Sequence, residues 1–101
     1  MNADDIETHA VASLDERYGH LRLPLPRAER AMAESMRRYG QLSPIVGCVR
    51  DARVAVVDGF KRLHAAARIG LEILVVRLQP LSERAAVAAI YGMNKGGRGL
   101  A

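Results

Sequence analysis

The stretch "VVDGFKRLHAAARIG", Val56–Gly70, decides the fold of this chain. An apolar run ends at Asp58 and Gly59, two cations follow at Lys61 and Arg62, and an alanine-rich segment completes the stretch. The change from an apolar run to helical spacing predicts a strand that passes into a helix at Gly59. The glycine and the two cations either punctuate this turn or hold a negatively charged group there.

The physics of a helix start keeps both interpretations open. The first amides of a helix lack intrahelical partners, and the helix dipole is positive at that end. Gly59 would let a phosphate approach the backbone closely, with Lys61 and Arg62 adding positive charge. Cations are unfavourable at a helix N-terminus unless an anion offsets them. That anion is either a bound phosphate or Asp58 acting as the N-cap.

Patterns along the rest of the chain predict a mixed α/β domain. Residues 1–20 are polar and weakly periodic, which predicts a flexible N-terminal arm or a loosely docked first helix. Leucines alternate with arginine and proline over 21–25, which predicts a short edge strand, because proline cannot donate to a central ladder. The remaining predictions are a helix over 27–39 stopped by Gly40, a hairpin of 44–49 and 54–58, a helix over 61–69 capped by Gly70, a strand over 72–78, and a helix over 82–91 capped by Ser82.

The composition indicates one globular domain. The chain has 101 residues, of which 50% are hydrophobic and 26% charged. The net charge is +4, and every cation except Lys61 and Lys95 is arginine. Arginine suits phosphate or carboxylate partners, although a GC-rich genome would produce the same excess.

Cysteine usage and hydropathy predict a cytoplasmic location. Cys48 is the single cysteine, so an intrachain disulfide and a multi-cysteine metal site are excluded. A lone cysteine suits a reducing cytoplasm. No apolar stretch approaches the roughly 18–20 residues of a membrane span, and the N-terminus is acidic, unlike that of a signal peptide. We therefore expect no membrane partner.

Three segments carry a family resemblance. "MAESMRRYGQLSPIV" (32–46), "VVDGFKRLHAAARIG" (56–70) and "YGMNKGGRGL" (91–100) resemble, in order and approximate spacing, the N-terminal domain of ParB-type chromosome and plasmid partition proteins, in the ParB/sulfiredoxin superfamily. The resemblance covers roughly residues 21–100. It implies an α+β fold, a small mixed sheet with helices packed against it. It also implies one nucleotide-binding domain over 21–101, preceded by the arm of residues 1–20.

The resemblance also implies a nucleotide site. In that family two motifs surround the triphosphate of CTP, with Mg²⁺. Gly59, Lys61 and Arg62 match the first motif, and Asn94 and Arg98 approximate the second with one extra residue between them. No catalytic residue and no protein metal ligand is assigned. The accessory candidates are Asp58, Phe60, His64 and Gln41, and for His64 a solvated helix position is the alternative.

The chain departs from the family pattern at two positions. Met93 stands where the family has an acidic residue that helps to hold the metal, and a thioether is not a hard oxygen ligand. We therefore expect Mg²⁺ to matter less here. Phe60 stands where sulfiredoxins carry their catalytic cysteine, so repair of oxidised peroxiredoxins is not expected. Asp58 and Gly59 match the start of the same motif in free-serine kinases of the superfamily, which keeps phosphotransfer open.

The function predicted first is a regulatory module that binds CTP or a related nucleotide and is linked to DNA partition or other DNA transactions. The alternative is an NTP-dependent phosphotransferase resembling the free-serine kinases, and a third interpretation is a protein-interaction domain without a ligand. Partition proteins resembling this domain read DNA with a helix-turn-helix region that follows the second motif, whereas this chain ends at Ala101. DNA is therefore expected only through a partner or a missing C-terminal region. A homodimer is a further expectation.

Overall fold

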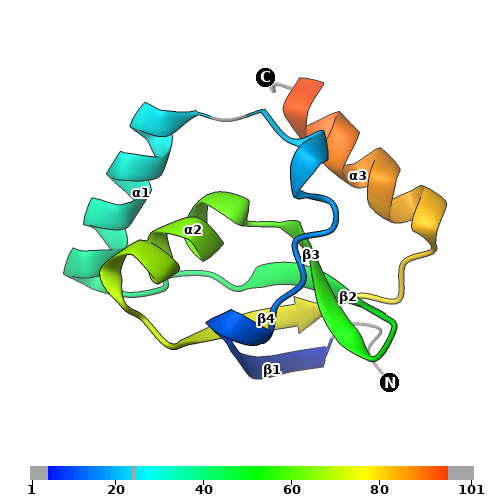
Figure 1. Ribbon diagram of the computed structural model, residues 1–101, viewed down its shortest axis with the longest axis horizontal. Helices are drawn as coiled ribbons and strands as arrows, with labels where there is room; N and C mark the ends of the chain where they lie inside the picture. The colour runs from blue at the N-terminus through cyan, green and yellow to red at the C-terminus, as the bar shows by residue number, and fades with distance from the viewer. Residues whose placement is uncertain (1–4, 24, 96–101) are drawn as a thin grey trace.

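The computed structural model describes residues 5–23 and 25–95, and side chains up to residue 92. Four strands form one mixed sheet in the order β1-β4-β2-β3, in which β4 runs antiparallel to β1 and parallel to β2, and β2 runs antiparallel to β3. This α+β arrangement confirms the predicted fold class (Figure 1). The elements are β1 (Asp5–Ala10), η1 (Val11–Ser13), η2 (Gly19–Leu21), α1 (Pro26–Tyr39), β2 (Ile45–Arg50), β3 (Arg53–Asp58), α2 (Phe60–Ile69), β4 (Ile73–Leu78) and α3 (Glu83–Lys95).

The β2–β3 hairpin confirms its prediction and turns through two residues. Asp51 and Ala52 have φ angles of 52° and 64°. Two successive residues with positive φ are typical of a type I′ turn, whose twist matches that of the flanking strands. The turn places β3 beside β2. At its other end, β3 leads directly into α2.

The helix ends follow the capping signals of the sequence. Gly40 and Gly70 end α1 and α2 with φ angles of 74° and 79°. The Ser82 Oγ accepts a hydrogen bond from the Ala85 amide at 3.0 Å, as expected of an N-cap. The predictions of these three helices and of the strand at β4 are confirmed.

The N-terminal third differs from its prediction. Residues 5–10 form the edge strand β1, where the sequence predicted an arm or a loosely docked helix. The strand predicted over 21–25 is wrong, because η2 ends at Leu21 and the described residues 22, 23 and 25 belong to no strand. β1 forms one edge of the sheet. At the other edge, the Asp15 amide donates to the Val54 carbonyl, and the Asp15 carbonyl accepts from the Val56 amide.

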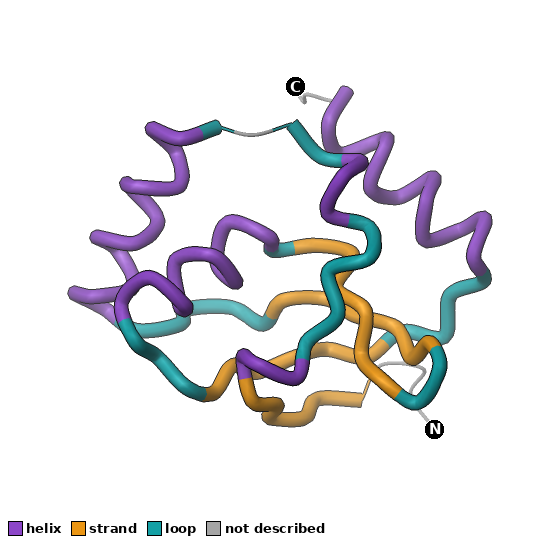
Figure 2. Tube along the Cα trace, viewed as in Figure 1, coloured by secondary structure: helices purple, strands orange, loops and turns teal. Residues whose placement is uncertain are grey.

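The core lies between the sheet and the helices. α1 packs on α2, while α3 packs against β3 and η2. Figure 2 shows residues 11–23 passing between the helices as loops and short turns before α1 begins. None of the described helices is long and apolar enough to cross a membrane. The largest fully buried side chains are Ile45, Cys48, Val56, Val57, Leu74 and Val76.

The Gln41 side chain extends the sheet beyond the start of β2. Its Oε1 accepts the Val75 amide at 2.7 Å, and its Nε2 donates to the Val75 carbonyl at 2.8 Å. β2 pairs with β4 only from Ile45, which stands opposite Val76. The amide of Gln41 therefore replaces the next peptide group of the ladder.

Gln41→Ala should lower the free energy of unfolding by about 1–3 kcal/mol, because both backbone groups of Val75 lose their partner. Urea denaturation followed by circular dichroism measures this change. Leu42→Ala, in the same loop and 76% exposed, is the matched control and should have little effect. Equal stability of the Gln41 variant and the control would contradict this role.

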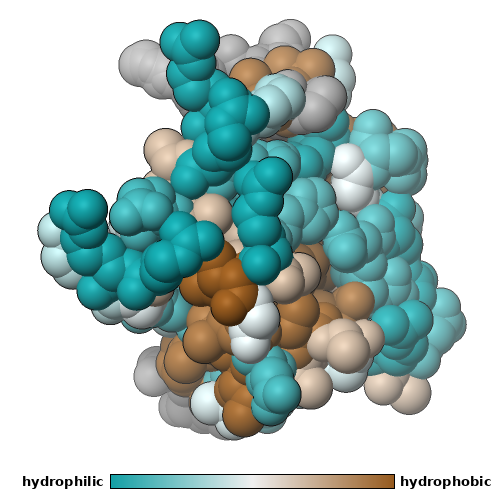
Figure 3. All heavy atoms as spheres, turned by 60° about the vertical axis from the view of Figure 1, so that its left-hand side comes forward, coloured by the Kyte–Doolittle hydropathy of each residue, from teal (hydrophilic) through white to brown (hydrophobic). Residues whose placement is uncertain are grey.

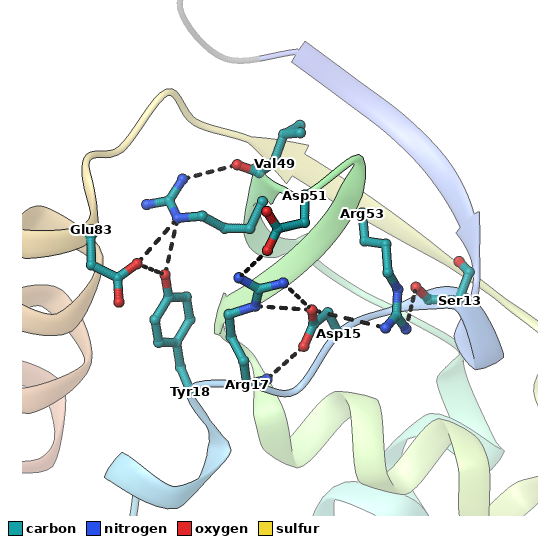
Figure 4. A network of polar contacts seen from close by, with 9 residues as sticks. Ser13, Asp15, Arg17, Tyr18, Val49, Asp51, Arg53 and Glu83 are labelled. Carbon is teal, nitrogen blue, oxygen red and sulfur yellow. Dashed lines mark hydrogen bonds and ion pairs between the residues drawn. The ribbon is translucent and has the colours of Figure 1, made fainter.

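A network of ion pairs fixes residues 13–18 against the hairpin (Figure 4). The Arg17 guanidinium lies between Asp15 at 2.7 Å and Asp51 at 3.1 Å. Its hydrogen bond holds the pKa of Asp15 below the ordinary value. In the same view the Tyr18 hydroxyl donates to Glu83 at the start of α3, at 2.6 Å. These contacts join the N-terminal segment to the hairpin and to α3.

Acid should weaken this network. Because the pKa of Asp15 is lowered in the folded chain, its stabilisation is present above the unfolded value, 3.8, and is lost as the pH falls through the folded value. Asp15→Asn should therefore flatten the acid limb of a plot of unfolding free energy against pH. Asp5→Asn, at an exposed carboxylate of β1, serves as the control. An unchanged acid limb in Asp15→Asn would refute the assignment.

Candidate functional site

A cleft of about 250 Å³ opens where β3 passes into α2. One side is formed by the junction itself, and the other by residues from η2 to α1 and by α3. We call it the anion cleft. Its lining residues are Arg22, Leu23, Leu25, Met32, Val57, Asp58, Gly59, Phe60, Lys61, Arg62 and Ile90.

Gly59 fixes the geometry of the junction. Its φ is 102°, in the left-handed region that favours glycine. A Cβ at this position would lie 2.5 Å from Ile45 Cγ2 and 2.8 Å from Ile45 Cβ, in the fully buried part of β2. No other residue fits there without displacing the core. The start of α2 therefore lies tightly against the sheet.

The N-terminus of α2 is open to a ligand. Its N-cap residue is Gly59, no capping side chain is found among the described residues, and its first turn has no acidic residue. The alternative that Asp58 acts as the N-cap is therefore wrong. The Asp58 side chain lies at the cleft but does not bond to the helix start. The free amides and the positive end of the dipole remain directed at the cleft.

Lys61 and Arg62 differ in how firmly they are held. The Arg62 guanidinium donates to the Pro44 carbonyl at 2.8 Å, so its position is fixed while its charge is not neutralised by a carboxylate. Among the residues that the structure describes, no carboxylate forms an ion pair with Lys61. Its ammonium group is thus available to an anion in the cleft.

Arg22 adds a third cation that the sequence analysis did not identify. Its guanidinium lies over the Phe60 ring, 5.6 Å from the centroid, and donates to Glu29 at 2.7 Å. This hydrogen bond lowers the pKa of Glu29. Phe60 is buried, and its ring packs against the Arg22 guanidinium. Phe60 therefore positions Arg22 in the cleft and takes no part in a reaction. Only the fold brings residue 22 to residue 60, so no local pattern could have indicated it.

Two accessory candidates lie outside the cleft. The His64 ring contacts Glu16 at 2.6 Å through Nε2 and Glu29 at 3.6 Å through Nδ1. Both ring nitrogens thus face carboxylates, while 36% of the side-chain surface stays exposed, in keeping with the solvated helix position that was the alternative. Gln41 is engaged by the backbone of β4. Neither side chain lines the cleft, although the His64 ring lies 6.4 Å from the ring of Phe60, the first residue of α2.

The second motif lies largely outside the described residues. The backbone of Asn94 belongs to α3, but its side chain and Arg98 are not described. Ile90, one turn earlier on α3, lines the cleft. The helix that carries Asn94 therefore runs past this site, while the roles of Asn94 and Arg98 remain predictions.

The described residues do not form a metal site of their own. Among residues 5–23 and 25–92, no group of three or more histidine, cysteine or acidic side chains could hold an ion. Asp58 is the carboxylate among the residues that line the cleft, and Mg²⁺ in proteins is commonly held by one or two carboxylates together with waters and phosphates. Cys48 is buried in the core, which raises the pKa of its thiol.

Known proteins resemble this chain in fold but do not match it in sequence. No protein-family model matches the chain, and no curated protein matches it in sequence. Among solved structures, it is similar to a C-terminally truncated chromosome-partitioning protein ParB from Caulobacter crescentus complexed with CTP-γ-S, with a TM-score of 0.79 at 20% identity. The match covers 95% of this chain and 56% of that one, so this chain spans just over half of the ParB structure.

Two further structures share the arrangement. A pNOB8-like ParB-N domain matches with a TM-score of 0.73 at 18% identity, covering 97% of this chain and 40% of that one. Sulfiredoxin from Arabidopsis thaliana matches with a TM-score of 0.71 at 15% identity, covering 85% of this chain and 97% of that one. These likenesses and the sheet described above establish that the chain has the fold of the ParB/sulfiredoxin superfamily.

Proposed function

We propose that this chain is a nucleotide-binding regulatory module that holds the phosphates of CTP or a related nucleotide in the anion cleft. The observation that carries the proposal is the convergence of Arg22, Lys61 and Arg62 on the uncapped N-terminus of α2. The Caulobacter ParB structure with the same fold is a complex with CTP-γ-S, which supports a nucleotide as the ligand.

Electrostatics favour an anion in this place. Two cations in the first turn of α2 oppose the helix dipole, and no acidic residue in that turn offsets them. A bound phosphate would relieve this repulsion and accept hydrogen bonds from the free amides. The missing Cβ of Gly59 faces Ile45 in the core, so the approach of a phosphate rests on the amides and the two cations. The unfavourable charges of the apo state thus become favourable contacts on binding.

The apolar part of the cleft would receive the rest of the nucleotide. Leu25 just before α1, Met32 of α1 and Ile90 of α3 line it beside the cations. Ligand sites commonly combine an apolar wall with a few placed polar groups. In this arrangement the phosphates lie at Gly59 to Arg62, and the nucleoside contacts α1 and α3. Asn94 and Arg98 would then add contacts from the end of α3.

The link to DNA is part of the same proposal. A second Caulobacter ParB structure of this fold, with a TM-score of 0.68 at 19% identity, is complexed to the centromeric parS site. In this chain the cations are spread along the sequence, so any intrinsic binding to DNA would rest on salt-sensitive phosphate contacts. We propose that this module acts on DNA through a partner or a C-terminal region, with nucleotide occupancy as the signal.

One observation favours phosphotransfer as a second candidate function. Asp58 lines the cleft beside Lys61 and, among the described residues, forms no ion pair. A carboxylate in this position could accept the proton of a hydroxyl nucleophile. Such an enzyme would turn over its NTP, whereas a regulatory module need only bind it. The two functions therefore differ in a measurable rate.

Replacing both helix-start cations should abolish nucleotide binding. Each charge-assisted contact contributes roughly 1.5–3 kcal/mol, so Lys61→Ala with Arg62→Ala should weaken binding by about a hundred-fold or more. Isothermal titration with CTP, ATP, GTP and UTP measures the affinity and identifies the base. Thermal unfolding of the variant checks that loss of the Arg62–Pro44 hydrogen bond has not unfolded the chain.

Arg68→Ala supplies the control for this experiment. Arg68 is an exposed arginine in the last turn of the same helix, so its removal lowers the net charge by one, half the change in the double variant, without touching the cleft. It should keep affinity close to that of the wild type. Unchanged affinity in the double variant, or equal losses in the double variant and the control, would exclude α2 as the phosphate site.

Nucleotide binding should depend little on Mg²⁺. With Met93 in place of an acidic residue and cations available for charge neutralisation, chelation by EDTA should change the affinity by less than about ten-fold, or about 1.4 kcal/mol. Phosphate release should be slow or absent. Met93→Glu should restore metal dependence if this position faces the ligand. Rapid Mg²⁺-dependent phosphate release, lost in Asp58→Asn, would instead favour the phosphotransferase.

A further inference from the structure

The pairing of β1 with β4 shows which amides and carbonyls of β1 point away from β4, toward the outer edge of the sheet. The Val11 amide donates to the Glu72 carbonyl at 2.8 Å, directly beyond the pair of Ala10 and Ile73. Hydrogen-bonded and non-bonded pairs alternate along an antiparallel ladder. The residues that bond inward to β4 are therefore 5, 7 and 9, and Ile6, Thr8 and Ala10 direct their amides and carbonyls outward.

This edge differs from the opposite edge of the sheet. There Asp15 pairs with the backbone of β3 through Val54 and Val56. In Figure 1, β1 lies at the lower border of the sheet, with β4 on its inner side. A strand with outward-directed backbone groups is a template for pairing with another chain. In the part of the chain that the structure describes, β1 is the one such template. Two copies that pair through β1 would therefore form a closed dimer and not an open-ended assembly.

The side chains of β1 complement a second copy of the same strand. Glu7 and His9 lie on one face, joined at 2.9 Å, with 50% and 25% of their side-chain surfaces exposed. If two copies pair antiparallel about a two-fold axis at Thr8, each Glu7 stands opposite His9 of the second copy. Thr8 then pairs with Thr8 through outward-directed backbone groups, and Ile6 pairs with Ala10, whose carbonyl also accepts a hydrogen bond from the Ser13 hydroxyl at 2.7 Å.

The alternative registers are less favourable. A shift by one residue would place outward-directed groups opposite inward-directed ones, which breaks the ladder. An axis at Glu7 would place two carboxylates opposite each other, and like charges directly opposite are destabilising. An axis at His9 would leave Ile6 without a partner. Charge and ladder geometry therefore select the axis at Thr8.

The open face of the sheet gains apolar contacts in the same register. Ile6 and Ile73 are 55% and 57% exposed, although both are large aliphatic side chains. Ala10 pairs with Ile73 in the sheet, so Ile6 of the second copy would lie next to this pair and cover it. In Figure 3, apolar side chains gather in the lower half of the face shown, below the hydrophilic side chains.

We propose that this chain forms a two-fold homodimer by antiparallel pairing of β1 with β1 of a second copy, in the register that sets Glu7 opposite His9. A ladder of six residues is far smaller than a standard protein interface. The dimer is therefore weak and depends on concentration. It leaves the anion cleft free, because the cleft contains no residue of β1.

Sedimentation equilibrium of the full chain, from about 10 µM to about 1 mM, should show reversible dimerisation. Thr8→Pro removes one outward amide without touching the inward bonds of residues 7 and 9, and should raise the dimer dissociation constant about ten-fold or more. Thr8→Ala keeps the amide and is the matched control. Circular dichroism confirms that both variants are folded.

A charge exchange tests the register independently. His9→Glu sets Glu7 opposite a second carboxylate, and Glu7→Lys sets a lysine opposite His9, so each variant alone should dimerise more weakly than the wild type. Mixed together, they set a glutamate opposite His9 in one cross-strand pair and a glutamate opposite a lysine in the other, and should form a heterodimer. A wild-type chain that stays monomeric up to about 1 mM overturns the proposal. So does a dimer that persists in Thr8→Pro, or a mixture that gains nothing over the separate variants.

Discussion

The close approach of Gly59 to Ile45 is the constraint on which the site depends. The backbone at position 59 is left-handed, and a Cβ there would lie only 2.5 Å from Ile45 Cγ2. Glycine is therefore the one residue that fits at the β3–α2 junction. This contact presses the first turn of α2 against the sheet and buries Phe60. The same turn then presents its amides and two cations to the solvent side. Packing of the core and exposure of the charges are thus two results of one contact.

The cations of the cleft are held by groups that serve other parts of the fold. Arg62 bonds to the loop before β2, and Arg22 joins η2 to α1 through Glu29. Glu29 in turn lies 3.6 Å from His64 on α2. Such contacts restrict long, flexible side chains before any ligand arrives, which reduces the entropy that binding must overcome. The polar contacts around the cleft therefore prepare it as well as stabilise the fold.

Local signals predicted most of the elements, because helix caps, turns and apolar spacing act within a few residues. Gly40, Gly70 and Ser82 end or begin helices as expected, and Gly59, Lys61 and Arg62 lie together at one helix start. Contacts between distant residues could not be predicted in this way. The polar strand β1 is recognised only by its pairing with β4, and Arg22 reaches the cleft only after the sheet and helices have formed. Gln41 and His64 found structural partners that are remote in sequence.

The cleft and the edge strand lie at different ends of the sheet order, and this separation has a physical consequence. β1 pairs with β4, whereas the cleft belongs to the end of β3 and the start of α2, so β4 and β2 stand between them. Substitutions at sites that share no partner usually have additive effects on free energy. Ligand binding and pairing of β1 should then be independent unless β2 and β4 shift together. Because Ile45 of β2 lies against Gly59 and stands opposite Val76 of β4, it links the two sites through the sheet.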